Sequence, residues 1–220
     1  MAIKDLMERE RRFQQASRER ELRCVEELEK HAFFRGVTID DVKRLAHSEE
    51  DIVRTGFADV VGDSTFQSVH ILSLNWSREY IRYVCSKSGN FQIPEANIHC
   101  DGLVCDSTGA QYSGYFDREV VTGLDKYHIL DRQFVGRPKE KVWYVGDSEN
   151  DLLCILHPEV IGILMYTGKK EKLNRLLCLL GADPEAIDED WNYFKIRHGV
   201  WCVRDWLSFA SLIKASTTSE

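Results

Sequence analysis

The sequence lacks the features that direct a chain into a membrane or onto a nucleic acid. No apolar run approaches the ~20 residues of a membrane-spanning helix. The N-terminal stretch MAIKDLMERERRFQQASRER is charged where a secretion signal is apolar. The formal net charge is −7, and the basic residues are scattered rather than clustered. We therefore expect a cytoplasmic protein whose main partner is a small-molecule substrate, with no nucleic acid and no membrane; the oligomeric state is left open.

The sequence also lacks the cysteine spacing of a metal cluster. Zinc and iron–sulfur sites need closely spaced cysteines, and none of the seven cysteines forms a CxxC pair. Most stand in apolar surroundings, which favours buried thiols in a reducing compartment. They are at positions 24, 85, 100, 105, 154, 178 and 202.

The 220 residues, 43% of them hydrophobic, are enough for one domain and a small appendage. Residues 3 to about 34 contain neither glycine nor proline and predict a helix. Gly36 ends that helix, and Thr38 with Asp41 resembles a capping box that opens a second. A further helix is expected over 48–61. The first third of the chain therefore predicts an all-helical cap, with its boundary at residues 1–62.

From residue 69 onward, short apolar runs alternate with helical patterns. This alternation predicts an α/β core over 63–220, a mainly parallel sheet with helices on both faces. The expected strands are 69–74, 141–146, 159–165 and 199–203, and the segment 96–116 reads as a strand that turns at Ser107–Gly109 and returns. The expected helices are 77–85, 123–134, 149–156, 169–181 and 204–213. Ligands of such sheets bind at the carboxyl ends of strands, where Ser73 and Asp147 stand.

Three stretches, in this order, resemble motifs of the haloacid dehalogenase (HAD) superfamily, in its phosphoserine-phosphatase-like branch with a helical cap. They are HILSLNWS, GLDK and VGDSENDL, and the similarity runs from about residue 30 to the C-terminal helix. The resemblance implies a HAD-like Rossmannoid fold. It also implies that Ser73 and Lys126 bind phosphate, that Asp147 holds Mg²⁺ and that Asp151 orients this group.

The first motif of that family, a strand ending in DxDx[TV], has no counterpart here. Its aspartate is the nucleophile that forms a phosphoaspartate, so no residue of this chain can be nominated for the attack. In the family that strand lies between the strands here at 69–74 and 141–146. The simplest way to satisfy the backbone is for these two strands to pair directly; otherwise the chain is part of a longer polypeptide.

Three functions follow as hypotheses. The first is a HAD scaffold, no longer a phosphatase, that serves non-hydrolytic small-molecule chemistry of isomerase, cyclase or pericyclase type in specialised metabolism. Its catalytic residues would be Ser73, Lys126 and Asp147, and Asn75, Trp76 and Ser148 would contact the substrate. The second is a Mg²⁺-dependent phosphate-monoester phosphatase represented by a shortened chain. The third is a non-catalytic pseudophosphatase that binds a phosphorylated metabolite.

Two site residues keep alternative interpretations. Lys126 is either a phosphate ligand or an ion-pair partner that keeps Asp147 or Asp151 charged. Trp76 either faces the pocket or packs in the core under the cap. The first hypothesis requires no cofactor. Mg²⁺ is expected only for the phosphatase, where Asp147 and Asp151 would be the metal residues and would hold the ion weakly without the missing ligands.

Overall fold

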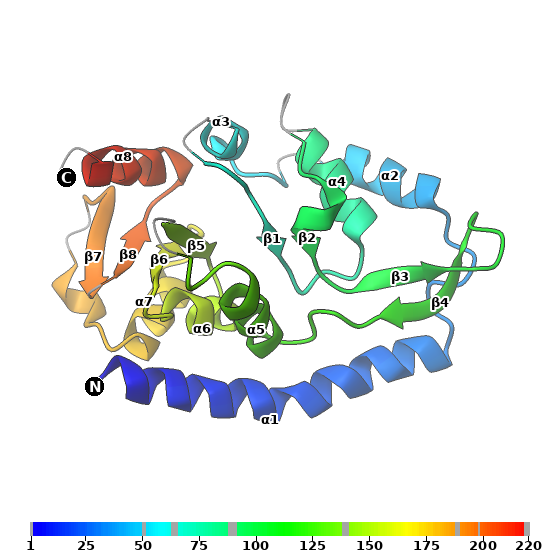
Figure 1. The fold of residues 1–220 in the computed structure, drawn as a ribbon, viewed down its shortest axis with the longest axis horizontal. Helices are drawn as coiled ribbons and strands as arrows, with labels where there is room; N and C mark the ends of the chain where they lie inside the picture. Colours follow the sequence, from blue (N-terminus) through cyan, green and yellow to red (C-terminus); the bar gives the residue numbers. More distant parts are fainter. Residues whose placement is uncertain are drawn as a thin grey trace. The chain divides into compact units, whose positions relative to one another are not determined.

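The computed structural model describes residues 2–49, 52–62, 66–87, 92–137, 141–187, 190–197 and 199–217. The chain divides into two compact units: unit 1 comprises Met1–Gln15 and Gly123–Glu220, and unit 2 comprises Ala16–Thr122. Helix α1 (Ile3–Lys30) begins in unit 1 and continues in unit 2 (Figure 1). The expected division into a cap at 1–62 and a core at 63–220 stays a prediction. The expected boundary itself lies beside residues 63–65, outside the described ranges.

Unit 1 contains the segments that follow the GLDK stretch. Its helices are α5 (Gly123–Gln133), α6 (Leu152–Ile155), α7 (Lys170–Leu179) and α8 (Trp206–Thr217). Two short 3₁₀ helices accompany them, η2 (Glu149–Asp151) and η3 (Pro184–Ala186). Its strands are β5 (Val142–Gly146), β6 (Val160–Met165), β7 (Tyr193–Arg197) and β8 (Val200–Val203).

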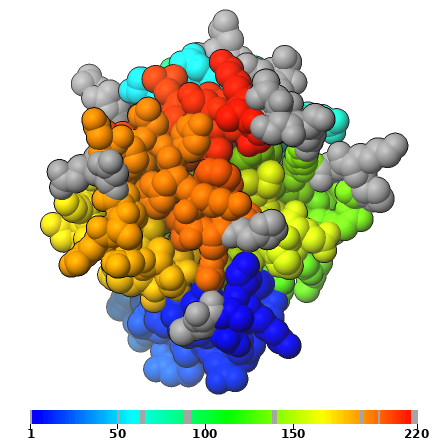
Figure 2. Space-filling view, turned by 90° about the vertical axis from the view of Figure 1, so that its left-hand side faces the viewer, coloured from blue at the N-terminus to red at the C-terminus, as the bar shows by residue number. Residues whose placement is uncertain are grey.

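The four strands of unit 1 form one sheet in the order β5-β6-β8-β7. Strand β6 runs parallel to both β5 and β8, whereas β7 is antiparallel to β8. Strands β5 and β7 are therefore the two edges of this sheet. Figure 2 shows the face of this unit on which the C-terminal segments lie, with β7, β8 and α8 in orange and red.

Both faces of the unit 1 sheet are covered by helices. Successive side chains of a strand point to opposite faces of the sheet. On β5, Trp143 and Tyr144 are such neighbours, and their side chains lie on opposite faces. The Trp143 ring packs edge-to-face on Phe209 of α8, with centroids 5.6 Å apart. The Tyr144 hydroxyl instead donates to Asp151, at the start of α6. All four side chains of α6 are buried under the sheet, and Ile163 and Leu164 of β6 are fully buried with them.

Unit 2 holds the other elements. Its helices, besides most of α1, are α2 (Ile39–Ser48), α3 (Phe57–Val61), α4 (Arg78–Ser86) and the 3₁₀ helix η1 (Glu95–Asn97). Strands β1 (Ile71–Leu72) and β2 (Ile98–His99) form a parallel pair. Strands β3 (Gly102–Cys105) and β4 (Tyr112–Asp117) form an antiparallel pair.

Two apolar clusters lie among the described residues of unit 2. In the first, Val25 of α1 and Val42 of α2 pack with buried side chains of β3 and β4: Leu103, Tyr112 and Phe116. In the second, α4 packs on β2 through Ile81, Cys85, Ile93, Ile98 and Cys100. The capping box expected at the start of α2 is confirmed. The Thr38 hydroxyl accepts from the Asp41 N–H, and the Asp41 carboxylate accepts from the Thr38 N–H.

The comparison with the sequence expectations is mixed. The α/β class is confirmed, as is the turn at Ser107–Gly109 between two antiparallel strands. Strand β1 pairs with β2, and the Ser73 N–H extends that ladder by donating to the His99 carbonyl at 2.9 Å. Direct pairing of 69–74 with 141–146 stays a prediction. Of the expected helix at 48–61, the described part contains Ser48 as the last residue of α2 and a separate helix over Phe57–Val61. None of the helices in the described ranges has the length and apolar character needed to cross a membrane.

Candidate functional site

The candidate site of unit 1 is the acidic turn that follows β5. The strand ends at Gly146, and the chain turns through Asp147 and Ser148 into η2. Ser148 caps η2, and its hydroxyl donates to Asp151 at 2.7 Å. The turn therefore folds back on itself and brings the carboxylate of Asp151 beneath the end of the strand.

Asp151 is the centre of this turn, and its carboxylate accepts five hydrogen bonds. On Oδ1 they come from the Lys126 ammonium at 2.7 Å and the Tyr144 hydroxyl at 2.8 Å. On Oδ2 they come from the backbone N–H groups of Asp147 and Ser148, at 3.2 and 3.1 Å, and from the Ser148 hydroxyl. Both oxygens are thus committed to holding the turn.

The central ion pair is withdrawn from water, since Asp151 is 5% exposed and Lys126 is 6% exposed. Burial raises the pKa of the Asp151 carboxyl. The charge of Lys126 and the hydrogen bonds that the Asp151 carboxylate accepts outweigh burial and hold this pKa below its ordinary value. Burial beside this carboxylate raises the pKa of the Tyr144 phenol well above its ordinary value. Asp151 is therefore ionised, and Tyr144 is a hydrogen-bond donor to it.

Two glycines allow the close approach that this arrangement needs. A Cβ at Gly146 would lie 2.3 Å from the Cβ of Asp151, and a Cβ at Gly123 would lie 2.3 Å from the Asn150 carbonyl oxygen. Both distances are far below van der Waals contact. Gly123 thereby lets the start of α5 lie against η2, and Lys126 stands on the first turn of that helix. The glycines of the GLDK and VGDSEN stretches are required by packing.

Asp147 differs from Asp151 because its side chain is half-exposed. Its Oδ2 accepts from the Lys172 ammonium at 2.9 Å, and the neighbouring Glu149 pairs with Arg175, also at 2.9 Å. Both cations come from α7. The turn therefore presents one accessible carboxylate–ammonium pair at the carboxyl end of β5.

Buried polar side chains in the unit 1 part of α1 contact the start of α5, beside the turn. Gln14 is 1% exposed; its side-chain carbonyl accepts from the Gly123 N–H at 2.9 Å, and its amide donates to Glu10 at 2.9 Å. Glu10 is 4% exposed. Burial raises the pKa of Glu10, against the lowering effects of Gln14 and the Arg9 charge, and the charge of Glu149 raises it further. Gln14 is a brace between α1 and the start of α5.

The structure brings together Lys126, Asp147, Ser148 and Asp151, and of the two interpretations of Lys126 the ion pair is the one it contains. The other three expected residues, Ser73, Asn75 and Trp76, belong to unit 2. There the Ser73 hydroxyl accepts from the Asn75 N–H at 3.1 Å, and the Asn75 side chain accepts from the Ser77 N–H at 2.9 Å. These bonds shape the turn between β1 and α4.

Trp76 packs among aromatic side chains of unit 2. Its ring stands edge-to-face on Phe34 and Phe116, with centroids 6.0 and 5.8 Å apart, and the residue is 39% exposed. One side of the ring is thus in contact with the first apolar cluster, as the core interpretation expects, while the rest remains accessible to solvent.

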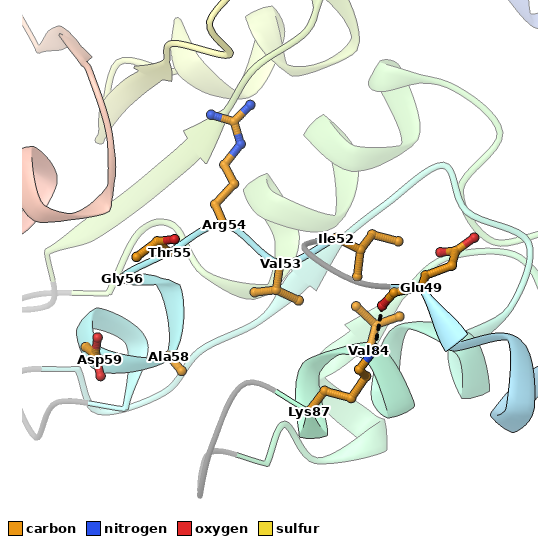
Figure 3. A pocket seen from close by; sticks show the side chains of 10 residues that line it. All are labelled: Glu49, Ile52, Val53, Arg54, Thr55, Gly56, Ala58, Asp59, Val84 and Lys87. Atoms are coloured by element: carbon orange, nitrogen blue, oxygen red, sulfur yellow. Dashed lines mark hydrogen bonds between the residues drawn. The ribbon is translucent and has the colours of Figure 1, made fainter. Parts of the chain in front are cut away.

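Unit 2 also contains a cavity of about 280 Å³ beside α3 and the end of α4 (Figure 3). Opposite charges line it, and the Lys87 ammonium, which points toward Glu49, donates to the carbonyls of Ala46 and His47 at 3.1 Å. None of the expected site residues lines it. The lining residues are Glu49, Ile52, Val53, Arg54, Thr55, Gly56, Ala58, Asp59, Val84 and Lys87.

Metal binding was expected at Asp147 and Asp151 for the phosphatase hypothesis. Within the described part of the chain, no three His, Cys, Asp or Glu side chains gather in a group that could hold a metal ion. To coordinate a cation, Asp151 would have to give up hydrogen bonds that hold the turn. Asp147 is the carboxylate of this pair that keeps an accessible oxygen.

Sequence reasoning missed Tyr144, Lys172, Gln14 and Glu10. Tyr144 carried a usable signal, because a tyrosine on the buried face of a strand needs a partner for its hydroxyl. Lys172, Gln14 and Glu10 carried no sequence signal, since they reach the turn only through the tertiary packing of α7 and α1.

The sequence is similar to a protein of yeast, whereas the other two comparisons found no match. No family model matches the chain, and no solved structure matches it. The chain is similar to a Saccharomyces cerevisiae protein named cold tolerance protein 1, with 35% identity over 177 residues. That segment is 73% of this chain and 55% of the yeast protein, so the chain spans about half the length of this curated relative.

We predict that Lys126→Met destabilises the protein by about 3–5 kcal/mol at neutral pH, because it leaves the buried carboxylate of Asp151 without its counter-charge. Chemical denaturation measures the change. Lys172→Met removes a lysine from a partly exposed pair and is expected to cost at most about 1 kcal/mol. The double variant Lys126→Met/Asp151→Asn should recover part of the loss, and a Lys126→Met variant as stable as Lys172→Met would show that the pair contributes little.

The stability of the protein should also decrease in acid through Asp151. Its folded pKa lies below its unfolded pKa, so the stabilisation is complete above the ordinary carboxyl pKa of about 4 and is lost as the pH falls through the folded pKa. Urea midpoints measured from neutral pH downward should fall less steeply for Asp151→Asn than for the wild type. Parallel curves for the two proteins would contradict the assignment.

Glu10 should act in the opposite direction. Because its folded pKa is raised, protonated Glu10 stabilises the fold below the ordinary carboxyl pKa, and this contribution is lost as the pH rises through the folded pKa. Glu10→Gln should therefore be more stable than the wild type at about pH 8, with the difference shrinking at about pH 4. Thermal unfolding at both values checks this, and Glu8→Gln, at an exposed position of the same helix, controls for the lost negative charge.

Proposed function

We propose that the chain is a HAD-like protein that has left phosphate hydrolysis for non-hydrolytic chemistry on a small molecule, of isomerase, cyclase or pericyclase type. The observation that carries the proposal is the difference between the two carboxylates of the turn. Asp151 and Lys126 are buried and bonded to each other, whereas Asp147 is half-exposed beside Lys172. The buried pair of Asp151 and Lys126 is suited to stabilising the turn. The exposed pair of Asp147 and Lys172 can contact a substrate.

Proton transfer is the chemistry that the accessible pair supports best. The Asp147 carboxylate can take a proton from a carbon atom next to a carbonyl while the electron pair moves toward the carbonyl oxygen. The Lys172 ammonium would stabilise the charge that develops on that oxygen. Return of the proton from Asp147 to a neighbouring atom completes an isomerisation, with no net oxidation and no water consumed.

Lys126 then has a positioning role. It fixes Asp151, whose Oδ2 accepts from the Asp147 N–H, so the ion pair orders the backbone that carries the reactive carboxylate. Ser148 completes the same support through its hydroxyl. Ser73 stays a predicted catalytic residue, and Asn75 and Trp76 stay predicted substrate contacts.

A Mg²⁺-dependent phosphate-monoester phosphatase is the second candidate, and the free edge of β5 favours it. Among the described strands only β6 pairs with β5, which leaves room for the strand that carries the nucleophilic aspartate in the enzymes that this chain resembles. Asp147 would then help to hold Mg²⁺, and a lysine beside it would contact the phosphate. The name of the yeast relative refers to cold tolerance and to no substrate.

Two assays on the same preparations separate the candidates. In the first, purified protein receives a panel of phosphate esters with Mg²⁺, and released phosphate is measured. In the second, it is incubated with a cell metabolite extract, and mass spectrometry follows compounds that change retention time at constant mass. We expect no phosphate release, and a mass-conserving conversion that Asp147→Asn slows at least ~100-fold.

The exposed carboxylate of Asp40 provides the matched control, because Asp40→Asn makes the same chemical change in α2. It should keep wild-type activity in both assays. Phosphate release that disappears in Asp147→Asn would overturn the leading proposal and establish the second candidate.

A further inference from the structure

Two ion pairs join the turn after β5 to helix α7, and the proposed reaction uses only one of them. Asp147 pairs with Lys172. Glu149, two residues further along the chain, pairs with Arg175, three residues further along α7. Residues three apart on a helix lie on the same face, about 4.5 Å apart along its axis. The guanidinium of Arg175 therefore lies next to the accessible carboxylate–ammonium pair, and all four residues belong to unit 1.

Arg175 is anchored through only one of its three side-chain nitrogens. Its Nε lies 2.9 Å from Oε1 of Glu149. Among the described residues, Nη1 and Nη2 of Arg175 have no partner. Unit 1 does not cover this side chain, which is 64% exposed. A guanidinium held at Nε keeps two parallel N–H donors, and that arrangement binds both oxygens of a carboxylate.

The charges of the two ion pairs indicate which anion the guanidinium would bind. Asp147 and Glu149 are negative, and Lys172 and Arg175 are positive, so the group as a whole is neutral. A carboxylate adds one negative charge to it. A phosphate ester adds nearly two at neutral pH, beside two carboxylates that repel it. A singly charged carboxylate is therefore the better match.

We propose that the substrate of this site is an oxo acid, whose carboxylate is bound by Nη1 and Nη2 of Arg175 while Lys172 contacts its carbonyl oxygen. This inference rests on the proposed function, because it names the class of carbonyl compound on which Asp147 acts. Oδ2 of Asp147 accepts from Lys172, which leaves Oδ1 for the proton. The C–H bond next to the carbonyl breaks, its electron pair moves toward the carbonyl oxygen, and the proton passes to Oδ1.

Glu149 is a positioning residue in this arrangement. It is the first residue of η2, and the buried Asp151 is the last. The ion pair between Asp151 and Lys126 therefore orders the backbone that carries the anchor of Arg175. A guanidinium that is already held in place loses less conformational freedom when a ligand binds.

Proton NMR of the full-length protein with matched probes tests binding and proton transfer separately. The probes are 2-oxobutanoate and 4-oxopentanoate, each beside its uncharged methyl ester, with ethyl phosphate to represent phosphate monoesters. Saturation transfer from the protein measures binding. In heavy water, loss of the signal from the protons next to the carbonyl measures their exchange for deuterium. We expect at least one oxo acid to bind more tightly than its ester and to exchange.

Variants of Arg175 assign the binding. Arg175→Gln should weaken binding of the oxo acid at least ~10-fold and leave the ester unchanged. Arg175→Lys should recover only part of the loss, because an ammonium keeps the charge without the paired donors. Asp147→Asn should still bind the oxo acid but lose the exchange. Arg132→Gln makes the same change at an exposed position in the last turn of α5 and should bind as the wild type does.

Three results would overturn the proposal. One is that neither oxo acid binds more tightly than its ester. Another is that Arg175→Gln, verified as folded by circular dichroism, binds the oxo acid as well as the wild type. The third is that ethyl phosphate binds more tightly than both oxo acids and depends on Arg175. Binding that depends on Arg175 without any exchange would contradict the proposed proton transfer and leave the carboxylate site standing.

Discussion

The buried carboxylate of Asp151 is the interaction on which the candidate site depends. An ionised group that is almost fully removed from water persists only when charge and hydrogen bonds replace the lost solvation. Here an ammonium, a phenol, a hydroxyl and two backbone amides do so. Each donor comes from a defined element, so the carboxylate fixes α5, β5 and η2 relative to one another within unit 1.

The two aspartates of the turn, which lie four residues apart in the sequence, differ in their surroundings. Asp151 is fully satisfied and serves the fold. Asp147 stands one step outside the strand, and its ion pair with Lys172 remains accessible. A turn with both carboxylates buried would have no group to offer a substrate, and a turn with both exposed would lack a fixed backbone. The proposed reactive site rests on this difference in burial.

Part of this could be predicted from the sequence. The strand ending at Gly146, the helix that carries Lys126 and the capping box at Thr38 all follow from local patterns that tertiary structure did not override. The pairing of β1 with β2 was not predicted, because unpaired backbone groups indicate that a strand needs a partner but not which strand that partner is. Strand β7 was missed, since YFKIR has little apolar alternation and gains its structure by pairing with β8. Lys172 and Gln14 reach the turn only through packing, which no local pattern encodes.

The burial of Lys126 has a consequence for the order of folding events. A lysine and an aspartate twenty-five positions apart along the chain cannot leave water one at a time, because either charge alone would meet the full cost of desolvation. The docking of α5 and the closure of the turn after β5 must therefore happen as one cooperative step. A partly folded state with only one of them complete would be sparsely populated, and unit 1 should gain or lose its candidate site as a whole.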